Sequence, residues 1–250
     1  MPRNCNNMSE TEQDKRPRRG RARRVSTPAN FGANKAEAVP PKTKAPRKPG
    51  FIAPTKAETA LLPDFPVLTM KQVHVPKTQA ECRKAVKEIL AAGITGFDTE
   101  AKPTFHVGQK SDGPHVVQFA LTDKAFIFQL HRKECENACS ELISSRQLLK
   151  VGFGLKNDHS QIRSRLGISL NHVLDLDQVF RKQGYRQLIG VRGAIGILFE
   201  QSFKKSKATT TSNWALPELS EKQLLDAAND AYAARKIMEA LQAASPDGRV

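Results

Sequence analysis

The chain has 250 residues, of which 40 are Lys or Arg and 25 are Asp or Glu, so its formal net charge at pH 7 is +15. This length permits one domain or two. Hydrophobic residues make up 39% of the chain, enough for a globular core. No segment approaches the roughly 18 apolar residues of a membrane span, and the first residues lack the apolar stretch of a secretory signal. We therefore expect neither feature.

The positive charge is concentrated at the N-terminus. Residues 1–50 hold 13 Lys or Arg and 4 Asp or Glu, and they show no apolar periodicity. Such a segment buries too little surface to offset the entropy of ordering it. We therefore expect residues 1–62 to be a disordered basic tail rich in Pro and Arg, and residues 63–245 to be a folded domain. The densest basic run, residues 16–24, would hold phosphate backbones without reading sequence, although a solubilising tail is the alternative.

The four cysteines, Cys5, Cys82, Cys135 and Cys139, lack the spacing to histidines that a zinc site needs. Reduced cysteines fit an intracellular compartment, so we expect a cytoplasmic protein, or a nuclear one if the source is eukaryotic. The sequence indicates no contact with a membrane, and it leaves the oligomeric state open.

Within the folded part, hydrophobic periodicity and capping signals predict the elements in chain order. An edge strand or an extended lead-in over 68–75 precedes a helix that a capping box at Thr78 opens and Gly93 ends. Three strands then form a meander, followed by alternating helices and strands. The expected ranges are 93–100, 115–121 and 124–130 for the meander, helix 134–145, strand 148–154, helix 157–166, strand 173–176, and helices 190–199 and 221–241. This order predicts a mixed α/β sheet with helices on its faces.

Two acidic residues stand at the end of the first meander strand. Side chains at i and i+2 of a strand share a face, so Asp98 and Glu100 point the same way and Phe97 and Thr99 point to the other side. Neighbouring carboxylates at the end of a buried strand repel each other unless a cation lies between them. Mg²⁺ or Mn²⁺ suits such hard oxygen ligands, although a solvated strand end is the commoner case.

Further acidic residues follow later in the chain. Asp158 comes four residues after the glycine that ends strand 148–154, near the start of a helix. Asp226 and Asp230 lie four residues apart on the last helix and therefore share one face, which is also compatible with a solvated polar stripe. Asp177, near the end of strand 173–176, is predicted to cap the following helix and not to act in catalysis.

The sequence resembles the DEDD 3′–5′ exonucleases, in particular RNase D and the exonuclease domain of the Werner syndrome helicase. The stretches that carry the resemblance cover roughly residues 65–243 and are GFDTE at 96–100, VGFGLKND at 151–158, SNW at 212–214 and LLDAANDAYA at 224–233. The resemblance implies an RNase H-like fold, and an enzyme that releases nucleoside 5′-monophosphates from the 3′ ends of DNA or RNA.

It also implies roles for the acidic residues. Hydrolysis of a phosphodiester needs an activated water and neutralisation of the transition-state charge, and two divalent ions, Mg²⁺ or Mn²⁺, supply both. Asp98 would bridge the two ions. Glu100 and Asp230 would hold the ion that carries the attacking water, and Asp158 would support the second ion through water.

The chain departs from the family pattern at two positions. The RNase D-like branch has a Tyr one turn before the last Asp, where its hydroxyl orients the attacking water, and Asp226 stands there in this chain. The branch of proofreading polymerases has a His five residues before the last Asp, and Leu225 excludes that branch. Ala101 replaces a larger residue that relatives often have after the Glu. We expect these changes to slow catalysis more than they affect the fold.

A basic loop precedes the last helix. Lys204, Lys205 and Lys207 lie beyond the core segment 190–199 and are candidate phosphate contacts, although a merely solvated loop fits them equally well. A second function class therefore stands beside the exonuclease, namely a nucleic-acid-binding module with weakened catalysis. Retention of all four acidic ligands favours the enzyme. No motif that reads bases is visible, so DNA and RNA both stay open as substrates.

Overall fold

The structure is a computed structural model that describes residues 50–104, 108, 111–205, 209 and 211–245. The chain divides into two units, residues 1–47 and 48–250, and the second contains every described residue. Within this described part, no helix is both long and apolar enough to cross a membrane. The three cysteines in it, Cys82, Cys135 and Cys139, are buried free thiols.

Six strands form one mixed sheet in the order β1-β4-β3-β2-β5-β6. The strands are β1 (Val73–His74), β2 (Ile94–Glu100), β3 (Val116–Ala120), β4 (Ala125–Gln129), β5 (Leu149–Gly152) and β6 (Val173–Asp175). The central three are antiparallel, as the expected meander requires, whereas β5 and β6 run parallel to β2 and β1 runs parallel to β4. Strand β2 therefore lies in the middle of the sheet, where the meander meets the parallel half.

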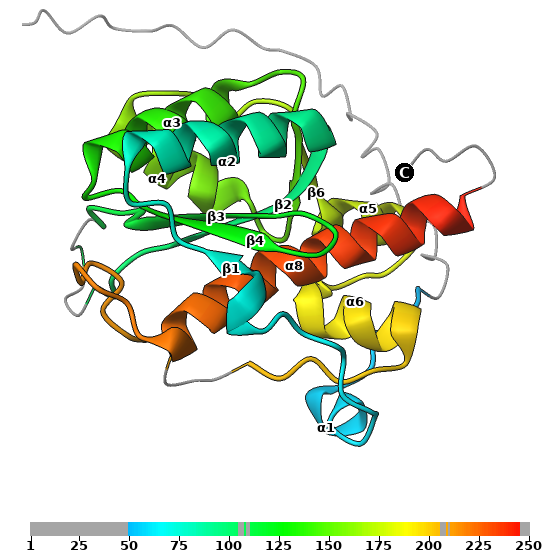
Figure 1. The fold of residues 1–250 in the computed structure, drawn as a ribbon. Helices are drawn as coiled ribbons and strands as arrows, with labels where there is room; N and C mark the ends of the chain where they lie inside the picture. The colour runs from blue at the N-terminus through cyan, green and yellow to red at the C-terminus, as the bar shows by residue number, and fades with distance from the viewer. Residues whose placement is uncertain (1–49, 105–107, 109–110, 206–208, 210, 246–250) are drawn as a thin grey trace, which may run out of the picture. The chain divides into compact units, whose positions relative to one another are not determined.

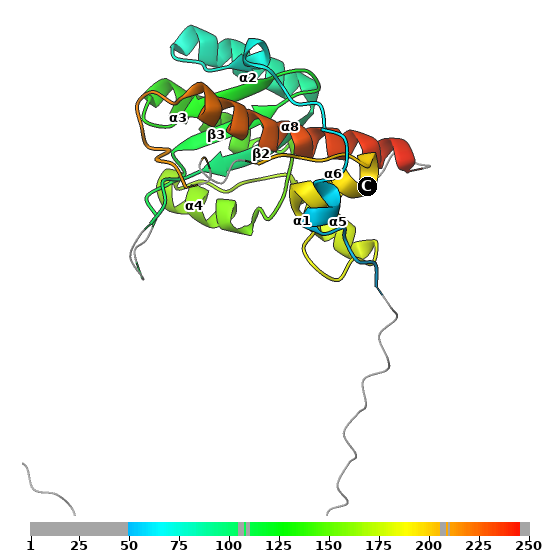
Figure 2. The ribbon, with the colours of Figure 1, turned by 90° about the horizontal axis from the view of Figure 1, so that it is seen from below.

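Helices cover both faces of this sheet. They are α1 (Lys56–Thr59), α2 (Gln79–Ala92), α3 (Lys133–Ser144), α4 (Lys156–Leu166), α5 (Leu176–Lys182), α6 (Gly190–Phe199) and α8 (Glu221–Ala244). Figure 1 shows α2 and α3 on one face and α8 on the other, and Figure 2 shows α8 running across β2 and β3. Phe97, Phe119 and Phe128 pack toward α2 and α3, and Val116, Ala120 and Ile127 pack against the alanines of α8. The expected mixed sheet with flanking helices is confirmed.

Local signals account for most element ends. The Thr78 side chain accepts the backbone N–H of Glu81 while the Glu81 carboxylate accepts that of Thr78, so the predicted capping box is present. Gly93 ends α2 with φ 69°, a left-handed conformation that costs glycine little. Ser220 and Gln223 form the second predicted capping box at the start of α8. The expected helix 190–199 is present as α6 with the same limits.

The segment 50–62 has structure, although it falls inside the range 1–62 that we expected to be disordered. Thr55 caps the short helix α1 with a capping box, and Ala53 is buried in the core on the α8 side of the sheet. Phe51 forms a β-bridge and a ring contact with Tyr185. These contacts join residues more than 130 positions apart, and local composition does not reveal them. Residues 1–49, the rest of the expected tail, lie outside the described residues.

The edge strand is shorter than expected. Only Val73 and His74 pair with β4, and a 3₁₀ turn, η1 (Met70–Gln72), precedes them. Leu68 does not join the sheet, because its backbone N–H donates to Asn229 Oδ1 of α8 at 2.7 Å. Leu68, which we had expected to begin the edge strand, therefore attaches the start of the domain to α8.

The acidic pair at the end of β6 holds two connections. Asp175 is the N-cap of α5, and its carboxylate also accepts the backbone N–H groups of Gly154 and Leu155 at 3.1 Å each. Asp177 instead accepts the N–H groups of Ile189 and Gly190 at 2.9 Å, at the start of α6. Asp177 therefore binds the start of a helix, as predicted, but that helix is α6 and not the following helix α5.

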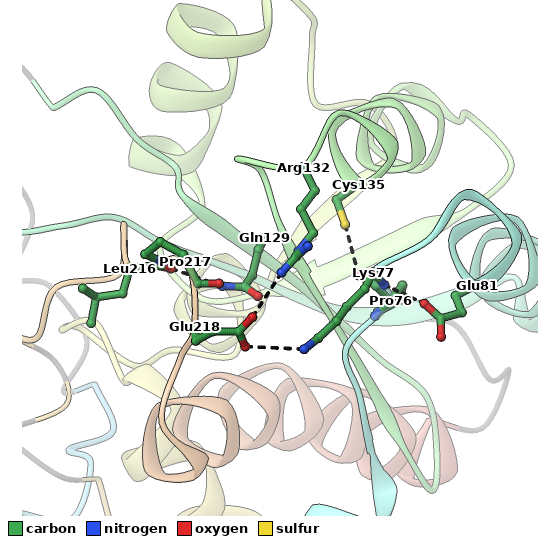
Figure 3. Close-up of polar contacts among 9 residues, drawn as sticks. All are labelled: Pro76, Lys77, Glu81, Gln129, Arg132, Cys135, Leu216, Pro217 and Glu218. Atoms are coloured by element: carbon green, nitrogen blue, oxygen red, sulfur yellow. Dashed lines mark hydrogen bonds and ion pairs between the residues drawn. The ribbon is translucent and has the colours of Figure 1, made fainter.

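A polar clamp fixes the segment that leads into α8 (Figure 3). Glu218 forms ion pairs with Lys77 at 3.4 Å and Arg132 at 3.3 Å, and Gln129 Nε2 donates to the carbonyl oxygens of Leu216 and Pro217. Gln129 is buried at the end of β4, so its amide has no access to water as an alternative partner. The clamp thereby sets where the first turn of α8 lies against the sheet, one turn before Asp226.

Lys150 is a fully buried lysine on β5. Its Nζ donates to the carbonyl oxygens of Leu142, Ser145 and Leu148 at 2.9–3.1 Å. Two of these carbonyls belong to the end of α3, where the last turn lacks partners within the helix. The side chain therefore closes that helix end and connects it to the sheet.

We expect Lys150→Met to lower the free energy of unfolding at pH 7 by about 1–3 kcal/mol, because buried carbonyls lose their donor. Burial lowers the pKa of Lys150 to about 8, whereas an unfolded lysine titrates near roughly 10.4. Between these values the unfolded wild type binds more protons than the folded form, so this residue makes wild-type stability rise with pH. Urea unfolding should therefore show a wild-type advantage that is constant below pH 8 and grows above it; a constant advantage up to pH 10 would contradict this account.

Candidate active site

Strand β2 presents Asp98 and Glu100 to the face that α8 covers. Gly96 lies on the same face two residues earlier, and a Cβ built there would stand 1.8 Å from the carbonyl oxygen of Ala231. Glycine is therefore required for α8 to lie this close to β2. The close approach brings Asp230, one residue before Ala231, to the end of the strand.

Three carboxylates meet at this point. Asp98, Glu100 and Asp230 each place an oxygen within 4.8 Å of the others. Asp230 is only 7% exposed, and its buried Oδ1 has no hydrogen-bond partner within the described part of the chain. A buried carboxylate oxygen without a partner is costly, so this arrangement calls for a cation.

Asp158 reaches the site from the other side of the strand. It lies in the first turn of α4, and its Oδ1 accepts a hydrogen bond from Thr99 Oγ1 at 2.5 Å. It lines the same cavity of about 350 Å³ as Asp98, Glu100 and Asp230, but it stands outside the group of three carboxylates described above. The turn before α4 is fixed by Asp175, so the position of Asp158 follows from the end of β6.

The electrostatics of the site reflect this crowding. Burial, then Asp158 and Asp230, raise the pKa of Asp98 well above its usual range. Burial, then Asp98 and Asp230, raise the pKa of Glu100. Burial raises the pKa of Asp230 as well, although Lys205 partly offsets it. Without metal, the negative charges of these buried carboxylates therefore repel one another, and a divalent ion would relieve that repulsion.

The three lysines of the basic loop have different positions. Lys205 Nζ lies 2.6 Å from Asp230 Oδ2, inside the acidic group. The Lys204 side chain is 74% exposed and pairs with Asp64 at 2.7 Å, away from the carboxylates. Lys207 lies outside the described residues. Of the expected phosphate contacts, the structure thus places one in the candidate site itself.

Asp226 lies one turn before Asp230 on α8, as its spacing predicted. It is half-buried, and its charge raises the pKa of both Glu100 and Asp230. It does not belong to the group of three, and it lines a neighbouring cavity of about 750 Å³ together with Lys205, Leu225 and Asn229. Its carboxylate therefore stands at the border between this cavity and the acidic site.

The donor set fits hard divalent ions. It consists of carboxylate oxygens, which Mg²⁺ and Mn²⁺ prefer, and it contains neither sulfur nor imidazole among the described residues of the group. Asp230 Oδ1 gives such an ion a ligand that no other described residue uses.

Comparison with known proteins agrees with this geometry. The sequence profile of a 3′–5′ exonuclease family matches residues 73–244. The chain belongs to this 3′–5′ exonuclease family. It is 27% identical over 151 residues to a 3′–5′ exonuclease of Arabidopsis thaliana, covering 60% of this chain and 52% of that one. It is 25% identical over 151 residues to the bifunctional 3′–5′ exonuclease/ATP-dependent helicase WRN of Mus musculus, covering 59% of this chain and 11% of that one.

The fold also matches solved exonuclease structures. Trypanosoma brucei RNase D in complex with RNA U12 superposes with a TM-score of 0.61 at 18% identity, covering 78% of this chain and 67% of that one. This confirms the RNase H-like fold expected of the exonuclease domain. The match to the curated relatives is partial, since the chain spans about half the length of the plant protein and about a tenth of the mouse one.

Two residues that position the acidic side chains, Thr99 and Gly96, were not predicted from the sequence. Thr99 was expected to point away from the site, but that orientation is what lets its hydroxyl hold Asp158. Gly96 was given no role beyond its place in the motif GFDTE, whereas it admits the backbone of α8. For Gly96 a signal was available, because it shares the face of Asp98 and Glu100 at a spacing of two residues.

Proposed function

We propose that this exonuclease domain hydrolyses phosphodiester bonds at the 3′ ends of DNA or RNA with two divalent ions, and releases nucleoside 5′-monophosphates. The observation that carries the proposal is the group of three carboxylates within 4.8 Å, with its buried unpartnered Asp230 oxygen. When bound, the ions would supply an activated water and neutralise charge on the transition state.

The chain's own residues would hold and orient these partners. The charges of both Asp158 and Asp230 act on Asp98, so Asp98 would be the residue that bridges the two ion positions. Glu100 and Asp230 would hold the first ion. Asp158, fixed by Thr99, would support the second through water. Asp226 would accept a proton from the attacking water or hold that water, in the place where related enzymes have a tyrosine.

A direct assay distinguishes DNA from RNA as the substrate. The RNA in the Trypanosoma brucei RNase D complex shows what that enzyme binds, and it makes RNA a reasonable substrate to test beside DNA. Single strands of matched DNA and RNA sequence, each labelled at the 5′ end, should shorten one nucleotide at a time with Mn²⁺ and stay intact with EDTA. Internal fragments, or cleavage that survives EDTA, would refute the proposal. Binding to both strands without cleavage under any metal condition would instead favour the nucleic-acid-binding module.

The basic N-terminal segment provides a separate prediction. We expect removal of residues 1–49 to leave turnover at saturating substrate nearly unchanged and to weaken binding, most strongly at low salt. The segment brings Lys and Arg to phosphates, and its contribution is the release of counterions. The cut is placed before residue 50 because α1 and Phe51 contact the folded domain.

The measurement is the dissociation constant for a single-stranded oligonucleotide across a salt series. The slope of log affinity against log salt should be shallower for the truncated protein. A full-length variant with the arginines of 16–24 changed to serine is the matched control and should behave like the truncation. Identical slopes for all three proteins would show that the segment does not touch nucleic acid.

A further inference from the structure

Lys205 carries a positive charge into the acidic group. Its Nζ lies 2.6 Å from Asp230 Oδ2, and about a third of its side chain is exposed. The side chain lines the cavity that holds Asp98, Glu100 and Asp158, and it also lines the cavity beside Asp226 and a third one beside α6. Lys205 thus lines all three cavities, and its amino group pairs with Asp230, a proposed metal ligand.

The backbone before Lys205 is fixed in place. Phe203 is buried in the core, and its carbonyl oxygen accepts a hydrogen bond from Arg192 Nε at 3.2 Å. The Ser202 N–H donates to the Pro63 carbonyl at 2.7 Å, and the Ser202 carbonyl accepts the N–H of Phe65 at 2.9 Å. The contacts of Ser202 and Phe203 therefore fix where the chain enters the site, and Lys205 follows two residues after Phe203. Lys204, its neighbour, points to Asp64 and solvent.

A single ammonium group is an incomplete partner for this site. It carries one charge, whereas the site holds three close carboxylates and Asp158 nearby. It occupies Oδ2 of Asp230 and leaves the buried Oδ1 without a partner among the residues that the structure describes. A divalent ion carries twice the charge and can be coordinated by several carboxylate oxygens at once. Lys205 and such an ion therefore need the same oxygen, and the ion is the stronger partner.

We propose that Lys205 is a resident cation of the acidic group, which competes with the divalent ion for Asp230 and turns to a substrate phosphate when the ion binds. The inference rests on the proposed function, because it takes the acidic group to be the metal site. It assigns two opposite effects to one residue. Lys205 weakens metal binding in the absence of nucleic acid, and it strengthens nucleic-acid binding once metal is present.

This arrangement couples the two ligands. A phosphate that draws Lys205 away from Asp230 frees a metal ligand, and a metal that displaces Lys205 frees a cation for phosphate. Metal and nucleic acid should therefore bind more tightly together than separately, and the coupling must be the same in both directions. The energetic gain in such coupling usually corresponds to a factor of about 5–150 in affinity.

The test is Mn²⁺ binding to the full-length protein, followed by the electron paramagnetic resonance signal of free Mn²⁺, with no nucleic acid present. Lys205→Met should bind Mn²⁺ about 5- to 150-fold more tightly than wild type. Lys204→Met is the matched control, because it removes the same charge from the adjacent residue but outside the acidic group. It should leave Mn²⁺ affinity close to that of wild type.

A second measurement tests the opposite effect of Lys205, namely that it strengthens nucleic-acid binding once metal is present. A single-stranded oligonucleotide with 3′-terminal phosphorothioate linkages should bind Mn²⁺-loaded Lys205→Met more weakly than Mn²⁺-loaded wild type. It should also tighten Mn²⁺ binding in wild type and have little such effect in the variant. Circular dichroism melting establishes that each variant is folded, and Lys205→Gln, which also removes the charge and should likewise bind Mn²⁺ more tightly, serves as the second variant if the methionine protein does not fold.

The outcomes separate the inference from the function on which it rests. Equal or weaker Mn²⁺ binding by Lys205→Met, in a folded protein that does bind Mn²⁺, overturns the competition and leaves the proposed metal site standing. No Mn²⁺ binding by wild type or by either variant overturns both. Tighter Mn²⁺ binding by Lys204→Met as well would show a general effect of surface charge and would also overturn the role assigned to Lys205.

Discussion

Asp98→Ala is expected to abolish Mn²⁺-dependent release of mononucleotides, lowering kcat by at least about 10³-fold. Asp98 is the residue proposed to bridge the two ions, so its loss would remove a ligand from both ion positions, and metal-ion catalysis supplies several kcal/mol of transition-state stabilisation. The protein should stay folded. Asp98 is surrounded by like charges, so the melting temperature without metal should stay equal or rise.

The measurement is single-turnover cleavage of a 5′-labelled oligonucleotide, with thermal unfolding recorded on the same preparations in EDTA. Asp123→Ala is the matched control, because Asp123 is an exposed carboxylate in the turn between β3 and β4. It should cleave at the wild-type rate. An Asp98→Ala protein that keeps more than a small fraction of the Mn²⁺-dependent rate would remove Asp98 from the centre of the site.

Asp226→Tyr is expected to raise the cleavage rate, by roughly tenfold. A carboxylate is shorter than a phenol, so Asp226 in its proposed role would hold the attacking water less well than a tyrosine would, and a misplacement of about 1 Å can cost about 10²-fold in rate. The adjoining cavity of about 750 Å³ leaves room for the larger ring. We accordingly expect wild type to be active but slow and to prefer Mn²⁺.

The rate against Mn²⁺ concentration distinguishes the two possible roles of Asp226. If it assists the water, the tyrosine variant is faster at unchanged Mn²⁺ affinity, and Asp226→Ala loses less activity than Asp98→Ala. If Asp226 has become a metal ligand, the tyrosine variant loses Mn²⁺ affinity and activity together. Asp226→Asn, which keeps the shape and removes the charge, separates the contribution of the charge from that of the side-chain length.

The parts of the fold that the sequence predicted well are those set by neighbouring residues. Thr78, Glu81 and Gly93 determine both ends of α2 within the helix itself, and period-two alternation places Asp98 and Glu100 on one face of β2. The predicted ranges of α3, α4 and α6 were correct to within a residue or so for the same reason. Local capping and periodicity depend on bonds that a short stretch of sequence can make alone.

The parts that the sequence did not predict depend on distant residues. Leu68 leaves the sheet because Asn229 binds its N–H, and residues 50–62 have structure because Tyr185 and α6 lie beside them. The position of Lys205 depends on Arg192 and Pro63 in the same way. The three acidic motifs are recognisable in order in the sequence, whereas the ion pair of Lys205 with Asp230 depends on how the fold brings the two residues together.

The central claim is that Asp98, Glu100, Asp158 and Asp230 together hold two divalent ions. Anomalous scattering from crystals of the protein soaked in MnCl₂ tests it most directly. The account predicts two Mn²⁺ peaks that share Asp98, one contacted by Glu100 and Asp230 and the other on the side of Asp158, with Lys205 no longer bonded to Asp230. Crystals saturated with Mn²⁺ that show no peak beside Asp98 would contradict it.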